Sequence, residues 1–198
     1  MSGRLPPNPP PLVPVVGSTR AWWRRLCRFI VVAAGWRLEG TLPNVPKLIL
    51  IGAPHSSFWD GVWGLLMKTA LGLRIGIMIK AELHRGPAGP LLRALGSIPV
   101  QRNKAFGVVD QMVERFNASD RLWLGITPEG TRRPVKRWKS GFWQIARGAG
   151  VPVQLVYFDY PSKTIGLGPL LQMGPDLEQE LAQIRAWYAP YRGKRHNV

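Results

Sequence analysis

The chain contains a single cysteine, Cys27, and only 11 acidic side chains among its 198 residues. One cysteine cannot form an internal disulfide or supply a CxxC metal cluster, as expected for a protein of a reducing compartment such as the cytoplasm. The few acidic residues stand against 27 lysines and arginines, so the formal net charge is +16. This excess of positive charge implies an anionic partner: nucleic acid, a phosphorylated metabolite or an acidic lipid surface.

The chain also lacks a long hydrophobic run near its N-terminus. The apolar run FIVVAAGW, residues 29–36, is far shorter than the roughly 20 residues that a membrane-spanning helix needs, and we do not expect a signal peptide. Residues 1–19 hold six prolines and are predicted to form an extended, mobile tail. The length of the chain predicts one folded domain.

Residues 22–33 give an amphipathic pattern on a helical wheel. The apolar side carries Trp22, Trp23, Leu26, Phe29, Ile30 and Ala33, and the other side carries Arg24, Arg25 and Arg28. A tryptophan-containing apolar face beside arginines is typical of a helix in a membrane interface. An ordinary helix docked on the domain would give the same pattern, and both can hold at once. We predict a basic amphipathic interfacial helix over residues 20–35, with its tryptophans, Phe29 and arginines in contact with the membrane.

Short apolar strands alternate with helical stretches from residue 47 onward. Strands are predicted at 47–53, 74–81, 97–102, 121–127 and 151–160, and helices at 58–72, 90–96, 105–118, 141–150 and 176–188. This alternation predicts an α/β domain over residues 36–190, with a largely parallel or mixed central sheet flanked by helices. A basic tail of residues 191–198 follows.

The stretch PHSSFWDG, residues 54–61, lies between the first strand and the next helix. Ser57 is a good N-cap, which puts Asp60 in the first helical turn and leaves His55 in the preceding loop. There the carboxylate can accept a hydrogen bond from one imidazole nitrogen and orient the histidine as a general base. The alternative, favoured by the spacing alone, is that Asp60 only caps the helix and His55 is an ordinary loop residue.

Two other kinds of site fit this stretch less well. A metal site would have to draw on His84 and His196, and neither has the spacing of metal ligands. A serine hydrolase would use Ser56 or Ser57, but no GxSxG turn occurs in the chain.

A second polar stretch, TPEGTRR at residues 127–133, follows a strongly apolar strand. Gly130 lets the backbone approach a ligand closely, and Arg132 can bind a phosphate through paired hydrogen bonds. Taken alone, the stretch could also be a solvated polar turn.

Together, HSSFWD as an H-x4-D motif and PEGTR at residues 128–132 resemble the motifs of the glycerolipid acyltransferase family, of the lysophosphatidate acyltransferase type. The resemblance covers about residues 36–160 and includes KAELHRGPAG (80–89), GSIPVQR (96–102) and GVPVQLV (150–156). The sequence departs from the family's pattern at Pro54, Pro99 and Gln101.

The resemblance implies transfer of a fatty acyl group from a thioester donor, acyl-CoA or acyl carrier protein, to the hydroxyl of a lysophospholipid such as 1-acyl-glycerol-3-phosphate. It implies His55 as the base and Asp60 as its orienting partner, with direct attack and no metal or other cofactor. The head group would be held by Arg102, Glu129, Gly130, Thr131 and Arg132. The positive charge would also bind an anionic membrane surface, on the cytoplasmic side of the cell membrane.

Two alternatives remain open on the sequence. One is a nucleic-acid-binding basic module, although the chain carries none of the recognised binding motifs. The other is an acyltransferase that acts on a different hydroxyl acceptor.

Overall fold

The computed structural model describes residues 20–87, 89–101 and 107–198. The predicted proline-rich tail, residues 1–19, lies outside this part of the chain, and so does Arg102. The elements follow in the order α1 (Ala21–Ala33), β1 (Arg37–Glu39), β2 (Lys47–Ala53), α2 (Phe58–Leu71), β3 (Ile75–Lys80), α3 (Ala81–Arg85), α4 (Gly89–Ala94), β4 (Ser97–Val100), α5 (Val108–Asn117), β5 (Leu122–Ile126), α6 (Gly141–Ala149), β6 (Val153–Asp159), β7 (Thr164–Leu171) and α7 (Leu177–Tyr188).

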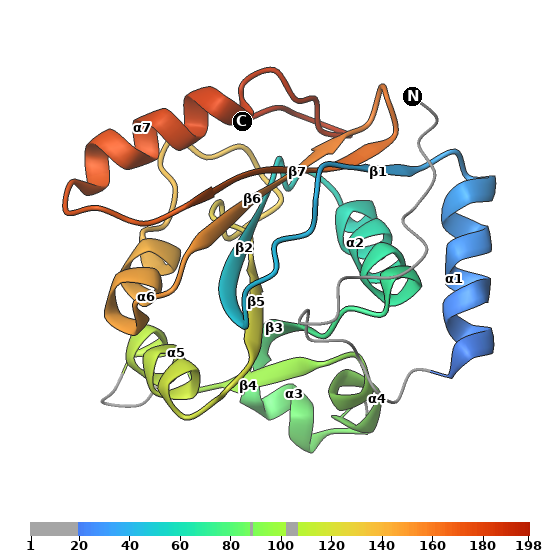
Figure 1. Ribbon diagram of the computed structural model, residues 1–198, viewed down its shortest axis with the longest axis horizontal. Helices are drawn as coiled ribbons and strands as arrows, with labels where there is room; N and C mark the ends of the chain where they lie inside the picture. The colour runs from blue at the N-terminus through green and yellow to red at the C-terminus, as the bar shows by residue number, and fades with distance from the viewer. Residues whose placement is uncertain (1–19, 88, 102–106) are drawn as a thin grey trace.

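The strands form one sheet in the order β1-β7-β6-β2-β5-β3-β4 (Figure 1). Neighbouring strands run parallel except β6 and β7, which pair antiparallel as a hairpin. The prediction of an α/β fold with a largely parallel or mixed sheet flanked by helices is therefore confirmed.

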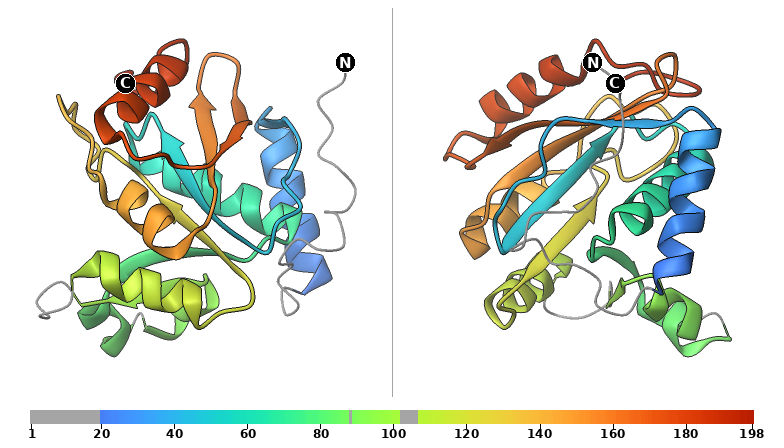
Figure 2. Two further views of the ribbon diagram at one scale, coloured as in Figure 1. Left: turned by 60° about the vertical axis from the view of Figure 1, so that its left-hand side comes forward. Right: turned by 45° about the vertical axis from the view of Figure 1, so that its right-hand side comes forward.

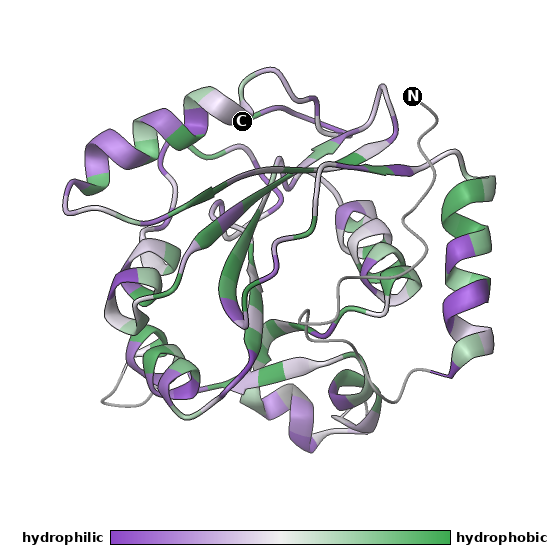
Figure 3. Ribbon diagram, in the orientation of Figure 1, coloured by the Kyte–Doolittle hydropathy of each residue, from purple (hydrophilic) through white to green (hydrophobic). Residues whose placement is uncertain are grey.

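The central strand β2 is buried on both faces, which explains why its sequence, KLILIGA, is apolar nearly throughout (Figure 3). Leu48 and Leu50 pack on one face with residues of α1 and α2. Ile49 and Ile51 pack on the other face with residues of α5, α6 and α7. The sheet thus lies between two layers of helices, as is usual for parallel strands, and Figure 2 shows these helices on opposite sides of it.

Three elements, β1, α3 and β7, were not expected from the sequence. The sequence of β7, TIGLGPLL, contains two glycines and Pro169, residue types that are uncommon inside strands. A Cβ on Gly166 would lie 1.9 Å from the Tyr157 ring, and one on Gly168 would lie 2.2 Å from the Trp187 ring. These glycines therefore mark close approach of aromatic rings within a strand. Pro169 lies near a register shift in the β6–β7 ladder.

Helix α1 packs antiparallel against α2. The Arg24 guanidinium donates to the Leu71 carbonyl at the end of α2, and the Trp36 ring, just beyond α1, stacks on Trp63 with centroids 5.1 Å apart. No helix in the described part of the chain is long and apolar enough to cross a bilayer.

The side of α1 that faces α2 is the one that bears arginines. Cys27 and Val31 are buried there, with Arg24 and Arg28 half-buried beside them. The opposite side, with its tryptophans, faces outward, and Phe29 is 70% exposed. The helix is thus docked on the domain, but with its apolar face turned away from the core.

Candidate active site

The candidate residues gather at one edge of the sheet because three neighbouring strands are parallel. β2 pairs with β5 on one side and with β6 on the other. The segments that follow these strands begin at Pro54, Thr127 and Tyr160, and they emerge side by side. The carboxyl edge of such a sheet is where α/β proteins bind ligands.

The structure brings His55 and Asp60 together. Ser57 caps α2, accepting a hydrogen bond from the Trp59 amide at 3.1 Å, and Asp60 completes the capping box. His55 folds back over this first turn from the preceding loop, and its Nδ1 lies 3.4 Å from Oδ2 of Asp60. The imidazole is 22% exposed, and its Nε2 makes no hydrogen bond with any described residue, so this nitrogen is free to meet a substrate.

The Asp60 carboxylate is buried and fully engaged. Oδ2 accepts the backbone amides of Ser56 and Ser57, both at 2.7 Å. Oδ1 accepts the hydroxyl of Tyr160 at 2.6 Å and that of Ser57 at 3.0 Å. Burial by itself raises the pKa of Asp60, but hydrogen bonds, first those from His55 and Tyr160, hold it below its ordinary value. Asp60 is therefore an anion at neutral pH, fixed in orientation beside the imidazole.

Glu129 is buried behind the histidine rather than exposed on the turn. Its Oε1 accepts the backbone amide of His55 at 3.0 Å, while Oε2 is buried without a hydrogen-bond partner among the described residues. Burial raises the pKa of this carboxyl above its ordinary value, although the contacts with His55 oppose the shift. In this geometry Glu129 ties the loop that carries His55 to the end of β5.

The remaining residues of the turn lie closer to solvent. Gly130 has a φ of +65°, a left-handed conformation that favours glycine. The Thr131 hydroxyl accepts the amide of Arg133 at 3.3 Å, and Arg132 is exposed. The guanidinium of Arg132 is thus available to a ligand at the same edge of the sheet as His55.

Arg102, the other predicted head-group ligand, lies outside the described residues. It follows β4, an edge strand three positions from β2 in the sheet.

Sequence reasoning missed two groups beside the pair. One is Tyr160, which follows β6 and bonds Asp60. The other is the stretch of residues 192–196, predicted as part of a basic tail: the Arg195 amide donates to the Ser56 hydroxyl at 3.2 Å, and a ring nitrogen of His196 lies 3.1 Å from the Arg132 carbonyl oxygen. The position of Tyr160 at the end of a predicted strand could have marked it as a candidate site residue. Nothing in the sequence of residues 192–196 indicates that this segment returns to the site.

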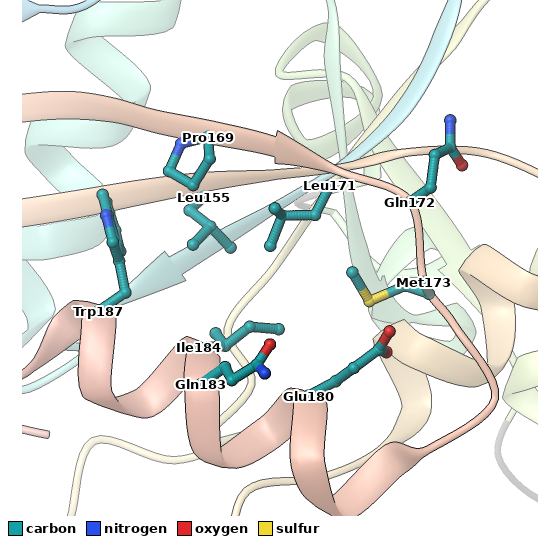
Figure 4. Close-up of a pocket in the computed structure, with 9 residues that line it drawn as sticks. All are labelled: Leu155, Pro169, Leu171, Gln172, Met173, Glu180, Gln183, Ile184 and Trp187. Carbon is teal, nitrogen blue, oxygen red and sulfur yellow. The ribbon is translucent and has the colours of Figure 1, made fainter.

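No cluster of three or more metal-ligating side chains occurs within residues 20–87, 89–101 and 107–198. A cavity of about 240 Å³ lies away from the histidine, between α7 and the β6–β7 hairpin (Figure 4). Its lining consists of Leu155, Pro169, Leu171, Gln172, Met173, Glu180, Gln183, Ile184 and Trp187, so it includes none of the candidate residues.

A family model and a solved structure match this chain. The sequence model of the acyltransferase family matches residues 39–159, which include both the histidine loop and the 127–133 turn. The chain belongs to the acyltransferase family. The solved structure of the 1-acyl-sn-glycerophosphate (LPA) acyltransferase PlsC from Thermotoga maritima is similar in fold, with a TM-score of 0.62 at 16% identity over 84% of this chain and 75% of that one. No curated protein sequence matches the chain.

Membership of this family confirms the prediction of an acyltransferase. The matched stretch ends at Asp159, so Tyr160 and the segment of residues 192–196 lie beyond it.

Proposed function

We propose that the protein is a glycerolipid O-acyltransferase that moves a fatty acyl group from a thioester to the hydroxyl of a lysophospholipid, with 1-acyl-glycerol-3-phosphate as the favoured acceptor. The observation that carries this proposal is the paired His55 and Asp60, with the imidazole partly exposed at the carboxyl edge of β2. Family membership supports the reaction class.

In the proposed reaction, Nε2 of His55 takes the proton of the acceptor hydroxyl as the oxygen attacks the thioester carbonyl. The new C–O bond forms, the C–S bond breaks, and the proton passes to the leaving thiolate. Asp60 stabilises the imidazolium through Nδ1. A positioned base accelerates such a step by about 10² to 10⁴. Because the thioester is already activated, this is a large share of the acceleration that the reaction requires.

The preference for a phosphate-bearing acceptor is supported by the exposed basic residues beside the histidine. Arg132 and Arg133 follow β5, which is the direct neighbour of β2. A guanidinium binds phosphate through two parallel hydrogen bonds. The buried site of Glu129 supports a positioning role for that residue, with the head group bound by Arg132 and its neighbours.

We further propose that the outward face of α1 rests on anionic lipid, on the cytoplasmic side of the cell membrane. Trp22, Trp23 and Phe29 are exposed together, and the net charge of +16 complements an acidic bilayer. Just beyond α1, Trp36 stacks on Trp63, which in turn stacks on the exposed Trp59 in the first turn of α2. The exposed Phe58 ring packs edge-on against Trp59. An acceptor could thus pass from the bilayer to His55 over a short apolar surface.

The test is to present the purified protein with a panel of lysolipid acceptors, with acyl-CoA and acyl carrier protein as donors, and to measure products by mass spectrometry. A higher rate of acyl transfer to lysophosphatidate than to neutral acceptors supports the proposal. Transfer only to neutral acceptors would assign a different hydroxyl, and no transfer with either donor would contradict it.

A further inference from the structure

The chain does not leave the domain after α7 but turns back along the sheet edge. The ring of Tyr191 stacks on Tyr157 with centroids 3.7 Å apart and planes 9° apart. The backbone of Arg192 then bonds twice to the end of β6: its amide donates to Asp159 at 3.0 Å, and its carbonyl accepts the Tyr160 amide at 2.9 Å. These contacts bring the next residues to the catalytic loop.

Residues 193–196 lie directly against the loop that carries His55. A Cβ on Gly193 would lie 2.7 Å from the Ser56 hydroxyl, so only glycine fits there. The bonds from the Arg195 amide to Ser56 and between His196 and the Arg132 carbonyl tie the segment to both motif loops. Figure 1 shows this end of the chain crossing above the ends of β2 and β6.

The segment presents positive charge at this place. The Lys194 ammonium lies 4.9 Å from the centre of the Trp59 ring, on the first turn of α2. Lys194 and Arg195 are exposed, and no carboxylate in the described part of the chain forms an ion pair with either. The acidic residues nearest the histidine, Asp60 and Glu129, are buried. The two cations therefore remain available to an anion from solution.

We propose that Lys194 and Arg195 form a phosphate-binding wall of the active site, next to the turn that carries Arg132. This inference rests on the proposed acyl transfer, because it names the group that the wall binds. The phosphate belongs either to the head group of the acceptor or to the phosphate-bearing carrier of the acyl donor. Both sources present the same oxygens to an ammonium and a guanidinium.

The experiment compares the double variant Lys194→Gln/Arg195→Gln with a control of equal charge, Arg115→Gln/Arg121→Gln. The control arginines are exposed, and they lie at the opposite edge of the sheet, where α5 ends and β5 begins. The segment is held by backbone groups of residues 192 and 195, which glutamine keeps, so the fold is expected to persist. Matched melting temperatures of the two double variants verify this, and the single variants repeat the test if the double variant melts early.

Two kinds of readout separate the sources of phosphate. KM is measured for lysophosphatidate and for the matching monoacylglycerol, and calorimetry measures binding of CoA and of glycerol 3-phosphate to the same samples. We expect the site variant to raise KM for lysophosphatidate, or to weaken CoA binding, by about tenfold or more relative to the control. A raised KM for lysophosphatidate would show that the wall binds the acceptor phosphate. Weaker CoA binding would show that it binds the phosphate-bearing carrier of the donor.

Unchanged KM and unchanged binding of both probes, relative to the control, would overturn the proposal. If the wild-type protein transfers no acyl group, the proposed function fails by itself. The calorimetry still tests the wall in that case, because CoA and glycerol 3-phosphate bind without any reaction.

Discussion

The hydroxyl of Tyr160 donates a hydrogen bond of 2.6 Å to Oδ1 of Asp60. Tyr160 lies in the turn of the β6–β7 hairpin, and Asp60 lies in the first turn of α2, after the neighbouring strand β2, so the bond joins these two connections. It holds the carboxylate in the rotamer that turns Oδ2 toward Nδ1 of His55. The bond also draws negative charge away from the side of the carboxylate that supports the imidazolium.

We predict that Tyr160→Phe lowers kcat by about tenfold and leaves KM nearly unchanged, because one charge-assisted hydrogen bond is lost from the orienting group and not from the substrate. With that donor gone, Asp60 stabilises protonated His55 more strongly. The acid limb of the pH profile of kcat/KM should therefore move to higher pH.

Tyr157→Phe is the matched control, because the Tyr157 hydroxyl also bonds a carboxylate, Glu39, at 3.0 Å, away from the histidine. It should leave kcat and the pH profile unchanged. If Tyr160→Phe behaves like this control, Tyr160 serves only the fold.

A second prediction concerns Glu129. Glu129→Gln retains an oxygen acceptor for the His55 amide and should keep most of the transfer activity, whereas Glu129→Ala leaves that buried amide unpaired and should lose about tenfold or more. Steady-state kinetics on both variants checks this. Equal loss in both would show that the charge of Glu129, and not its hydrogen bond, is needed, as expected of a direct head-group ligand.

The raised pKa of Glu129 also predicts a pH effect on stability. A carboxyl whose folded-state pKa exceeds its unfolded value, about 4.3, is protonated more readily in the folded state, so the free energy of unfolding should fall as pH rises from that value through the folded pKa. Urea unfolding across this range should show the decline in the wild type and a smaller decline in Glu129→Gln. An identical slope in both proteins would contradict the assignment of the shift to Glu129.

Arg132 provides a third prediction, on acceptor choice. Arg132→Lys should lower kcat/KM for lysophosphatidate, and Arg132→Ala should lower it further, by about one to two decades, because lysine keeps the charge but loses the paired geometry. Transfer to the matching monoacylglycerol should change much less. Equal losses on both acceptors would assign Arg132 to the fold or to the donor.

The fourth prediction tests the outward face of α1. Trp22→Asp/Phe29→Asp should weaken sedimentation with anionic vesicles by more than tenfold, because insertion of each ring contributes about 1.5 to 3 kcal/mol, while transfer to a detergent-dispersed acceptor should be spared. Leu170→Asp, at an exposed apolar residue of β7, is the control. Unchanged sedimentation of the α1 variant would show that α1 only packs on the domain and does not bind the membrane.

The sequence predicted the described helices and strands other than β1, α3 and β7 within about three residues because their apolar patterns are local. It also predicted Ser57 as the N-cap of α2, which follows from the chemistry of one helical turn. The pairing of His55 with Asp60 was implied by the family resemblance, whereas the spacing alone favoured Asp60 as a cap only. The common edge of the histidine loop and the 127–133 turn follows from parallel pairing alone.

What the sequence did not reveal depends on contacts between distant segments. Tyr160 reaches Asp60 only because β6 lies beside β2, a strand order that no local pattern records. The direction in which α1 faces depends on the end of α2, whose Leu71 carbonyl accepts Arg24. The glycines of β7 could be understood only once the rings of Tyr157 and Trp187 were seen against them.

The central claim is that His55 is a base oriented by Asp60, and not that Asp60 merely caps α2. Asp110 offers a comparison, because it caps α5 in the same way, accepting the Gly107 amide at 3.1 Å, but it lies in the first turn of a helix that does not follow the histidine loop. Both Asp60→Asn and Asp110→Asn should thus disturb a helix start, and only the first should disturb the base.

The most direct measurement is single-turnover acyl transfer by folded samples of His55→Ala, Asp60→Asn, their double variant and Asp110→Asn. We predict that His55→Ala loses about 10² to 10⁴ in rate, that Asp60→Asn is similarly impaired, and that the double variant is little worse than either, because the two residues act as one unit. Asp110→Asn should retain the wild-type rate. A rate near wild type in His55→Ala, or equal losses in Asp60→Asn and Asp110→Asn, would contradict the account.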